Sequence, residues 1–418
     1  MSDDADGPPE TPTRRSYLKA GGSVLAAGLL AGCTGETGEN SVNGSDPATT
    51  SSEPTAESTT AESSTDTDAG TEDGSYAVSM SPMGEVAFEE PPETIFTRLT
   101  HHAGMAFALG RGDSITAMHA PEYYDGLWNQ FVKRLPGVSL DWTGLYSSWE
   151  PSKEKLYELD SDVHLADPAW ITKQDDWNVD EIEEIAATVS PWFGNSLSDR
   201  HAEPAPAYAD GYEYYTLWEQ FELVAEAFRE RERYDALATV HEELLATIED
   251  GLPVESERPS AVMLASADLN EIYAYTLSNP GFLTAHTRPL GARDAFEGSV
   301  ESNSVVDFET LLEADPDVIL FLGGFEPGTS LPRRREAFRS DPVASEITAV
   351  QTGRMYPQGA RYQGPILNLF QLEMTAKQLY PDAFGEWPTY EEGPYPEIPA
   401  EERLFDRQRV ADAINGNV

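Results

Sequence analysis

From about residue 95 onward, the chain alternates between short apolar runs and longer segments with helical periodicity. Two runs, "TIFTRLT" (94–100) and "SITAMH" (114–119), are typical of strands. The intervening "AGMAFALG" (103–110) is typical of a helix that Gly110 closes. Short strands that alternate with helices predict an α/β fold with mainly parallel sheets.

Between Tyr214 and Asp250 the pattern changes to one uninterrupted helical segment without Pro or Gly. Its apolar stripe has the four-three-four spacing of an amphipathic helix and consists of Leu217, Phe221, Val224 and Phe228. A helix of roughly 35 residues is about 50 Å long, which is longer than one small lobe requires. Charges crowd at Arg231 to Tyr234, where we expect any break. The strand–helix alternation then resumes at "SAVMLAS" (260–266), so we expect two Rossmann-like lobes joined by a single long α-helix, with a cleft between them.

One short motif occurs twice in the chain. The segment "EKLYELDSDVHL" (154–165) returns as "ETLLEADPDVIL" (309–320), with the same residue at seven of the twelve positions. In each copy a helix leads through an Asp-rich turn into a buried strand. The repeat therefore predicts that each lobe contains the same helix–strand module.

The first 75 residues do not have the pattern of a folded domain. Arg14 and Arg15 precede a short apolar run that ends in "LAGC" at Cys33, which is typical of a twin-arginine lipoprotein signal with a lipidated cysteine. The run is too short to span a bilayer. A buried structural role is the alternative for Cys33, the only cysteine in the chain. Residues 34–75 are acidic and rich in Ser and Thr, which predicts a disordered tether.

The charge is strongly negative, with a formal net value of −47 from 74 acidic and 27 basic residues. Only six of the basic residues are lysines, and an acidic, lysine-poor surface is typical of proteins from very salty cells. The sequence has no basic patch of the kind that binds nucleic acid, so we expect no nucleic-acid partner.

Four fragments, in this order, resemble the substrate-binding proteins of ABC importers for iron–siderophore complexes, haem and cobalamin. They are "ETIFTRLTHHAGMAFALGRGDSITAMH", "EPSKEKLYELDSDVHLA", "VVDFETLLEADPDVIL" and "FRSDPVASEITAVQTGRMY". The resemblance covers about residues 92–385. It gives the expected organisation as signal 1–33, tether 34–75, N-terminal lobe 76–213, linking helix 214–250, C-terminal lobe 251–385 and a tail with a short helix, 386–418.

The resemblance also implies how the protein meets its membrane partners. In the family, one Glu on each lobe docks onto Arg residues of the permease, and these positions match Glu154 and Glu309, the first residues of the two repeat copies. Ordinary solvated carboxylates, favoured at a helix start by the helix dipole, are the alternative. We expect a lipid-anchored monomer on the extracytoplasmic face of the membrane, with an ABC permease and its ATPase as partners.

The candidate ligand-binding residues follow the carboxyl ends of the predicted strands, because ligands bind there in open parallel sheets. Histidines and aromatic residues at converging loops suit a bulky, partly apolar ligand. The candidates are His101, His102, His119, Tyr146, Trp149, Trp170, Tyr275, Phe325, Arg361 and Tyr362.

Several ligands fit this pattern. An iron(III)–siderophore complex needs only an Arg and aromatic walls, since the chelator already fills the coordination sphere of the iron. Hydroxamate binders of the family place an Arg just before the Glu-Pro of the N-lobe loop, where this chain has Ser147, Ser148 and Trp149 before Glu150, so hydroxamates are not assigned. Haem, cobalamin and a free metal ion are alternatives, the histidines being possible ligands to iron or another metal. Hydrogen-bonded structural histidines are the plain alternative.

An enzyme is the competing class of function. Three histidines near strand ends are enough for a hydrolytic zinc site. The sequence contains no His-Glu-x-x-His, Gly-x-Ser-x-Gly or Walker motif. We therefore expect a binding protein that is not an enzyme, has no resident cofactor and captures an iron-chelate-type ligand.

Overall fold

The computed structural model of the protein describes residues 74–173, 177–266 and 271–418. Within these, Ser75–Val418 form one compact unit. Arg14, Arg15, Cys33 and nearly all of the expected tether lie outside the described residues.

The N-terminal lobe is built on a parallel four-stranded sheet in the order β5-β4-β3-β6. Its strands are β3 (Ile95–Thr97), β4 (Ile115–Met118), β5 (Tyr146–Ser147) and β6 (Val163–Leu165). All residues of β3 and β6 are buried, as expected for a parallel sheet with both faces covered. The lobe also contains an antiparallel hairpin of β1 (Tyr76–Met80) and β2 (Gly84–Phe88), and the helices α2 (Thr100–Ala108), α3 (Pro121–Val132), α4 (Lys153–Leu159), α5 (Pro168–Ile171) and α6 (Val179–Thr188).

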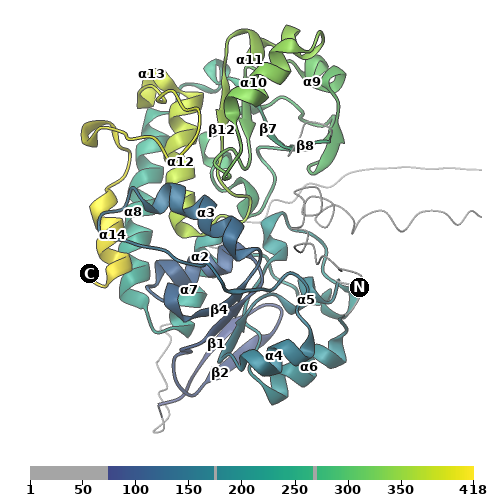
Figure 1. Ribbon diagram of the computed structural model, residues 1–418, viewed down its shortest axis with the longest axis vertical. Helices are drawn as coiled ribbons and strands as arrows, with labels where there is room; N and C mark the ends of the chain where they lie inside the picture. Colours follow the sequence, from purple (N-terminus) through teal and green to yellow (C-terminus); the bar gives the residue numbers. More distant parts are fainter. Residues whose placement is uncertain (1–73, 174–176, 267–270) are drawn as a thin grey trace, which may run out of the picture. The chain divides into compact units, whose positions relative to one another are not determined.

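The C-terminal lobe has a mixed sheet in the order β10-β8-β7-β11-β12, with β9 paired to β7. Its strands are β7 (Ser260–Ala265), β8 (Ile272–Tyr275), β9 (Arg293–Asp294), β10 (Ser304–Val306), β11 (Val318–Phe321) and β12 (Met355–Pro357). Strands β7, β9, β11 and β12 are parallel, and β8 is antiparallel to both of its neighbours, β7 and the edge strand β10. Its helices are α9 (Phe308–Ala314), α10 (Leu331–Ser340), α11 (Thr348–Gln351), α12 (Pro365–Leu379) and α13 (Pro381–Phe384). The two-lobe α/β fold predicted from the sequence is confirmed (Figure 1).

The connection between the lobes is helical but interrupted. It consists of α7 (Leu217–Ala227) and α8 (Arg231–Gly251). The chain turns at Arg229, which has a left-handed backbone with φ of 52°, and the amide of Glu230 donates to the carbonyl of Ala225. The interruption therefore lies a few residues before the charge cluster at which we expected a break. Because the residue in this left-handed conformation is an arginine and not a glycine, the sequence gives no clear signal for the turn.

Helix α12 and the last residues of the chain complete the core. Every residue of α12 is buried, and both α12 and α14 (Arg407–Asn415) contact α8 (Figure 1). Residues 386–418, here called the C-terminal segment, are held by a buried ion pair between Arg407 and Glu373 of α12. Tyr395 Oη donates to the same carboxylate at 2.7 Å.

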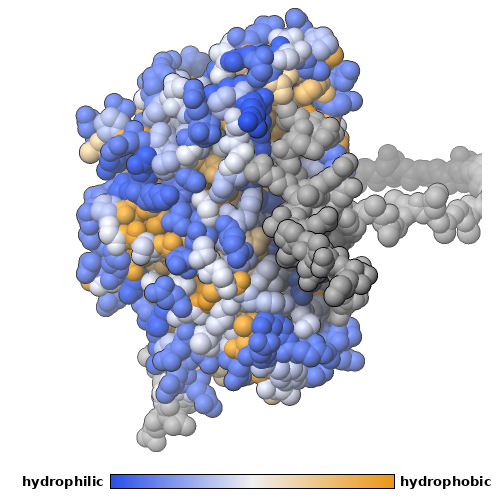
Figure 2. All heavy atoms as spheres, in the orientation of Figure 1, coloured by the Kyte–Doolittle hydropathy of each residue, from blue (hydrophilic) through white to orange (hydrophobic). Residues whose placement is uncertain are grey.

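The C-terminal segment also bonds to both lobes. The amide of Tyr395 donates to the carbonyl of Gln130 in α3, and Arg335 of α10 donates to the carbonyl of Tyr390. Arg233 of α8 donates to the carbonyl of Ile414. The face in Figure 2 is mostly hydrophilic with smaller apolar areas, in keeping with the net charge of −47.

Candidate functional site

Four consecutive strands of the N-terminal lobe deliver side chains to one place. Arg98 follows β3 directly, His119 follows β4, Trp149 follows β5, and Trp170 lies in α5 after β6. The guanidinium carbon of Arg98 is 4.3 Å from the ring centre of Trp149 and 4.6 Å from that of Trp170. The ring centres of His119 and Trp149 are 4.3 Å apart. These side chains converge because parallel strands end at the same edge of the sheet.

Arg98 is the unusual member of this cluster. Its side chain is almost wholly buried, with 1% exposed, and among the described residues none of its guanidinium nitrogens has a hydrogen-bond partner. Burial lowers the pKa of Arg98 to about 9, against smaller opposing effects of Tyr362 and Glu150. The group therefore remains charged at neutral pH. A buried cation that packs on aromatic rings and makes no hydrogen bond to an anion calls for a functional explanation, since Glu150 acts on Arg98 without a direct bond.

His119 is neutral beside this cation. Burial, and then the charge of Arg98, lower its pKa to about 3. Its ring contacts Tyr124 at 5.6 Å between centres as well as Trp149. A neutral imidazole and two indoles thus form the surroundings of the Arg98 guanidinium, and these suit an anionic group with aromatic or apolar surface.

The C-terminal lobe approaches the cluster through Arg361 and Tyr362. Thr100 of α2 donates to the carbonyl of Tyr362 at 3.0 Å, which joins the lobes here. Arg361 forms an ion pair with Asp199, and Nε donates at 3.0 Å. Burial alone would lower the pKa of Arg361, but Asp199, together with Tyr362 and Tyr275, outweighs burial and holds the pKa well above its ordinary value. Arg361 is therefore bonded directly to a carboxylate, whereas among the described residues Arg98 is not.

Arg361 also stacks on aromatic rings. Its guanidinium carbon is 5.0 Å from the ring centre of Tyr362 and 5.7 Å from that of Tyr275. Tyr275 donates from its hydroxyl to Asn303 at 3.0 Å. The predicted pair Arg361–Tyr362 and Tyr275 thus lie together, beside the N-terminal lobe.

His101 and His102 follow β3, as the sequence pattern indicated, and lie in the first turn of α2 within the core. Both are fully buried, and His102 Nε2 lies 2.8 Å from Gln220 Oε1. The His101 ring packs between His102 and Phe282, at 3.9 and 4.7 Å between ring centres. Burial lowers the pKa of His102 to about 3 and that of His101 well below its ordinary value. Over the described ranges, no three His, Cys, Asp or Glu side chains are placed to hold a metal ion.

Two further candidates, Phe325 and Tyr146, lie in different places. Phe325, 2% exposed, packs against Phe131, Tyr390 and Tyr395, so it belongs to the core beside the C-terminal segment. Tyr146 is in β5, and Lys155 Nζ lies 5.0 Å from its ring centre. Phe325 thus lies away from Arg98, whereas Tyr146 is near enough to raise the pKa of Arg98 slightly.

The two repeat copies form matching modules. Helices α4 and α9 have equal length, and in each an N-cap side chain, Ser152 or Asp307, accepts from a backbone amide. Each ends at an aspartate with a left-handed backbone, Asp160 or Asp315, before a buried strand. The duplicated sequence therefore corresponds to duplicated structure.

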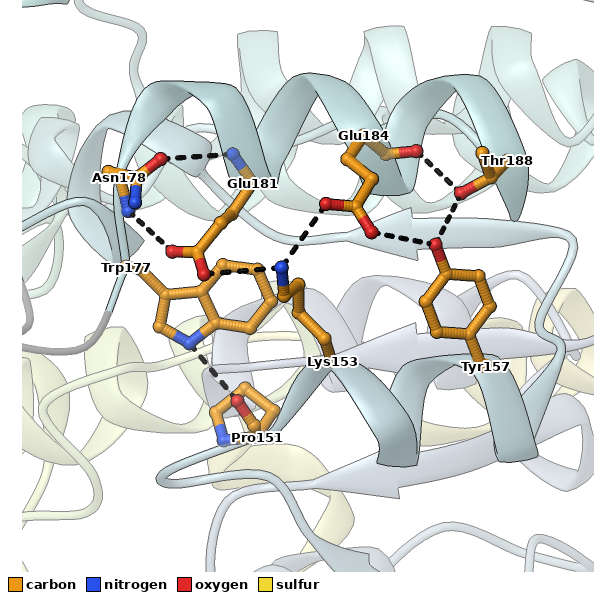
Figure 3. Close-up of polar contacts among 8 residues, drawn as sticks. All are labelled: Pro151, Lys153, Tyr157, Trp177, Asn178, Glu181, Glu184 and Thr188. Atoms are coloured by element: carbon orange, nitrogen blue, oxygen red, sulfur yellow. Dashed lines mark hydrogen bonds and ion pairs between the residues drawn. The ribbon is translucent and has the colours of Figure 1, made fainter.

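Helix α4 is fixed against α6 by polar contacts on one side (Figure 3). Lys153 forms ion pairs with Glu181 at 3.3 Å and Glu184 at 3.1 Å, and Tyr157 donates to Glu184 at 3.1 Å. Glu154 lies one residue beyond Lys153 and is exposed, as is Glu309 in α9. Within the described part of the chain, neither carboxylate has a hydrogen-bond or ion-pair partner, so both are available to a partner protein.

A family model described as "Periplasmic binding protein" matches residues 101–362, which is more than half of the chain. The chain belongs to the periplasmic binding protein family. Proteins of this family are solute-binding proteins of transporters. No curated protein matches the sequence.

Solved structures agree with this binding-protein fold. A periplasmic binding protein from Veillonella parvula has a TM-score of 0.53 and 15% identity, over 73% of this chain and 97% of its own. The petrobactin-binding protein YclQ from Bacillus subtilis has a TM-score of 0.50 and 15% identity, over 73% and 97%. CeuE from Helicobacter pylori, solved with Ni(II) bound, has a TM-score of 0.50 and 15% identity, over 74% and 90%. Identities this low establish the fold alone.

Sequence reasoning missed the central residue of this binding protein's candidate site. Arg98 lies inside the run "TIFTRLT" (94–100) that the sequence predicted as a strand, but β3 ends at Thr97. The strand-end rule therefore selected His101 and His102 and passed over the residue that directly follows the strand. An arginine at such a position is ordinarily solvated. Its burial becomes visible only when Trp149 and Trp170, from later strands, are placed on either side of it.

Proposed function

We propose that the protein is the substrate-binding component of an ABC importer and captures an anionic iron(III)–siderophore-type complex. The observation that carries this proposal is the buried guanidinium of Arg98, which lies between Trp149 and Trp170 and makes no hydrogen bond among the described residues. Iron(III) complexes of catecholate and carboxylate chelators combine negative charge with flat apolar surface. Their anionic oxygens would accept from Arg98, while their rings or chains pack on the indoles.

The relatives support the proposal at the level of ligand class. YclQ is described as petrobactin-binding, and the family to which the chain belongs serves transporters. No protein ligand to the iron is required, since the chelator supplies its coordination sphere. Haem carries carboxylates that would also meet Arg98, and it is the alternative that the experiment must separate from a siderophore.

The test has two parts. Mass spectrometry of ligand that copurifies from the native host identifies the cargo directly. Titration of the purified protein with a panel of ferric catecholates, neutral ferric hydroxamates, haem and cobalamin, followed by tryptophan fluorescence, gives the selectivity. We expect strong quenching by an anionic ferric complex and weaker binding of neutral complexes. Absence of binding by every member of the panel, or tightest binding of a neutral ligand, would contradict the proposal.

We further propose that Glu154 and Glu309 are the docking carboxylates for the permease. Both are exposed at the second position of matching seven-residue helices, one in each lobe. Lys153 and Tyr157 fix α4 to α6, so Glu154 would be held in a constant orientation (Figure 3). Arginine residues of a permease would pair with such carboxylates.

Attachment to the extracytoplasmic membrane face is also proposed. Arg14 and Arg15 would direct twin-arginine export, and Cys33 would carry the lipid. No helix among the described residues is long and apolar enough to cross a bilayer. Mass spectrometry of the mature N-terminus tests this proposal, because an unmodified N-terminus upstream of Cys33 would refute lipidation.

A further inference from the structure

A second cationic site lies away from the Arg98 cluster, where α3 meets the C-terminal segment. A cavity of about 140 Å³ is lined by four basic residues and one exposed acid, together with Pro396 and Ile398. The basic residues are Lys133, Arg134, Arg403 and Arg407, and the acid is Glu397. Since the chain has 74 acidic and only 27 basic residues, a cavity lined by four basic residues and one acid is far more positive than the composition would predict.

Two of these arginine side chains are held in place by hydrogen bonds from Nε to backbone carbonyls. Arg134 Nε donates to the carbonyl of Tyr395, and Arg403 Nε donates to the carbonyl of Ile398 at 2.9 Å. In the described ranges, neither guanidinium has an ion-pair partner, and their Nη nitrogens make no hydrogen bond. Each group is thus fixed at Nε while its outer nitrogens remain available to an acceptor.

Arg407 gives a second, independent indication. It is 4% exposed and forms an ion pair with Glu373 through Nη2. Its Nη1 is buried, and within the described part of the chain it has no hydrogen-bond partner. A buried N–H donor without an acceptor is costly, so the guanidinium of Arg407, a residue that lines the cavity, is incompletely satisfied.

A neighbouring cavity provides a contrast. It has a volume of about 380 Å³ and is also lined by Arg403, Arg407 and Arg409, but Glu243 and Asp406 line it as well. Arg409 is paired there with Glu243. The positive charge of the larger cavity is therefore balanced by acids, whereas in the smaller one only Glu397 opposes Lys133, Arg134 and Arg403.

We propose that the smaller cavity binds a small tetrahedral oxyanion of the phosphate or sulfate class, which joins α3 to the C-terminal segment. Its volume is several times the roughly 30 Å³ that one water molecule occupies in the liquid, so such an ion fits. Guanidinium forks match oxyanions in geometry as well as charge. The anion stabilises the attachment of the C-terminal segment and takes no part in binding the transported ligand.

The proposal is tested by calorimetric titration of the purified full chain with sodium phosphate and with sodium sulfate, in low-chloride buffer at constant ionic strength. Arg403→Gln and Lys133→Gln each remove one exposed cation without touching the buried Arg407. Each is expected to weaken binding about tenfold or more, as loss of a charge-assisted hydrogen bond does. The exposed Arg333 of α10 supplies the matched control, and Arg333→Gln should bind both anions as the natural protein does.

A crystal soaked in selenate locates the ion, since its anomalous signal should appear between Lys133, Arg134, Arg403 and Arg407. No measurable binding of phosphate or sulfate would overturn the proposal. Equal weakening in Arg403→Gln and Arg333→Gln would do the same, because it would indicate a general effect of net charge. Binding of the iron chelate should be unchanged in Arg403→Gln, so failure at this site and failure of the proposed function are separate results.

Discussion

Replacement of Arg98 by methionine should stabilise the empty protein while it abolishes capture of an anionic ligand. The lowering of the Arg98 pKa from 12.5 to about 9 makes the charged form roughly 5 kcal/mol less favourable than in water, at 1.36 kcal/mol for each pKa unit. Two desolvated cation–π contacts with Trp149 and Trp170 stabilise the charged form by up to about 2 kcal/mol each. Methionine has a similar length and no charge, so Arg98→Met is expected to gain about 1 kcal/mol.

Urea denaturation followed by far-ultraviolet circular dichroism measures this gain, and tryptophan quenching measures ligand binding in the same preparations. Arg335→Met is the matched control, because Arg335 is also a partly buried arginine but donates to the carbonyls of Met355 and Tyr390. Its removal leaves acceptors without donors and should lower stability. A loss of stability in Arg98→Met similar to that of the control, with ligand binding retained, would refute the reasoning and make Arg98 a structural residue.

Three other predictions concern docking, pH and the core. Glu154→Arg combined with Glu309→Arg should abolish uptake by cells and leave ligand binding intact; unchanged uptake would contradict the docking proposal. The folded-state pKa of His102 is about 3 and the unfolded value is 6.5, so the unfolded state binds the extra proton and stability falls as pH drops below 6.5. His102→Gln should therefore reduce the slope of unfolding free energy against pH between 6.5 and 4 by up to about 1.4 kcal/mol per pH unit. Urea denaturation at several pH values measures this slope, and equal slopes in the variant and the natural protein would refute the prediction. Arg407→Met should lower the unfolding free energy by about 3–5 kcal/mol in urea denaturation, because Glu373 is left buried and unpaired. Adding Glu373→Gln to this variant should restore part of the loss. An equal loss in the single and the double variant would argue against the ion pair as the cause.

The features that the sequence predicted best are the individual strands and the repeated helix–strand module, because these depend on local patterns of apolar and polar residues. Strand β3, strand β4 and the module that begins at Glu154 lie where their periodicity placed them, and the repeat at Glu309 forms the same helix–strand unit. The convergence of His119, Trp149 and Trp170 followed from one rule about parallel strands. These features depend on neighbours in sequence or on a general property of sheets.

The features that the sequence did not reveal depend on contacts between distant segments. His101 and His102 were predicted only as residues that follow the first strand, and their burial in the core, within a helix that begins directly after Leu99, was not foreseen. Arg98 is distinctive only through rings that come from residues 51 and 72 positions later in the chain. The role of the C-terminal segment likewise rests on its pairing with Glu373, for which Arg407 alone gives no sequence signal.

The attachment of the C-terminal segment has a consequence for the order in which the protein can be made. Tyr395 and Arg407, close to the end of the chain, complete the surroundings of the buried Glu373. Until these residues have been synthesised, the buried carboxylate of Glu373 in α12 lacks its hydrogen-bond and ion-pair partners. The carbonyl of Gln130 in the N-terminal lobe likewise lacks the amide of Tyr395. The core around α12 is therefore completed by residues 395–407, which follow it in the chain, and not by α12 and its lobe alone.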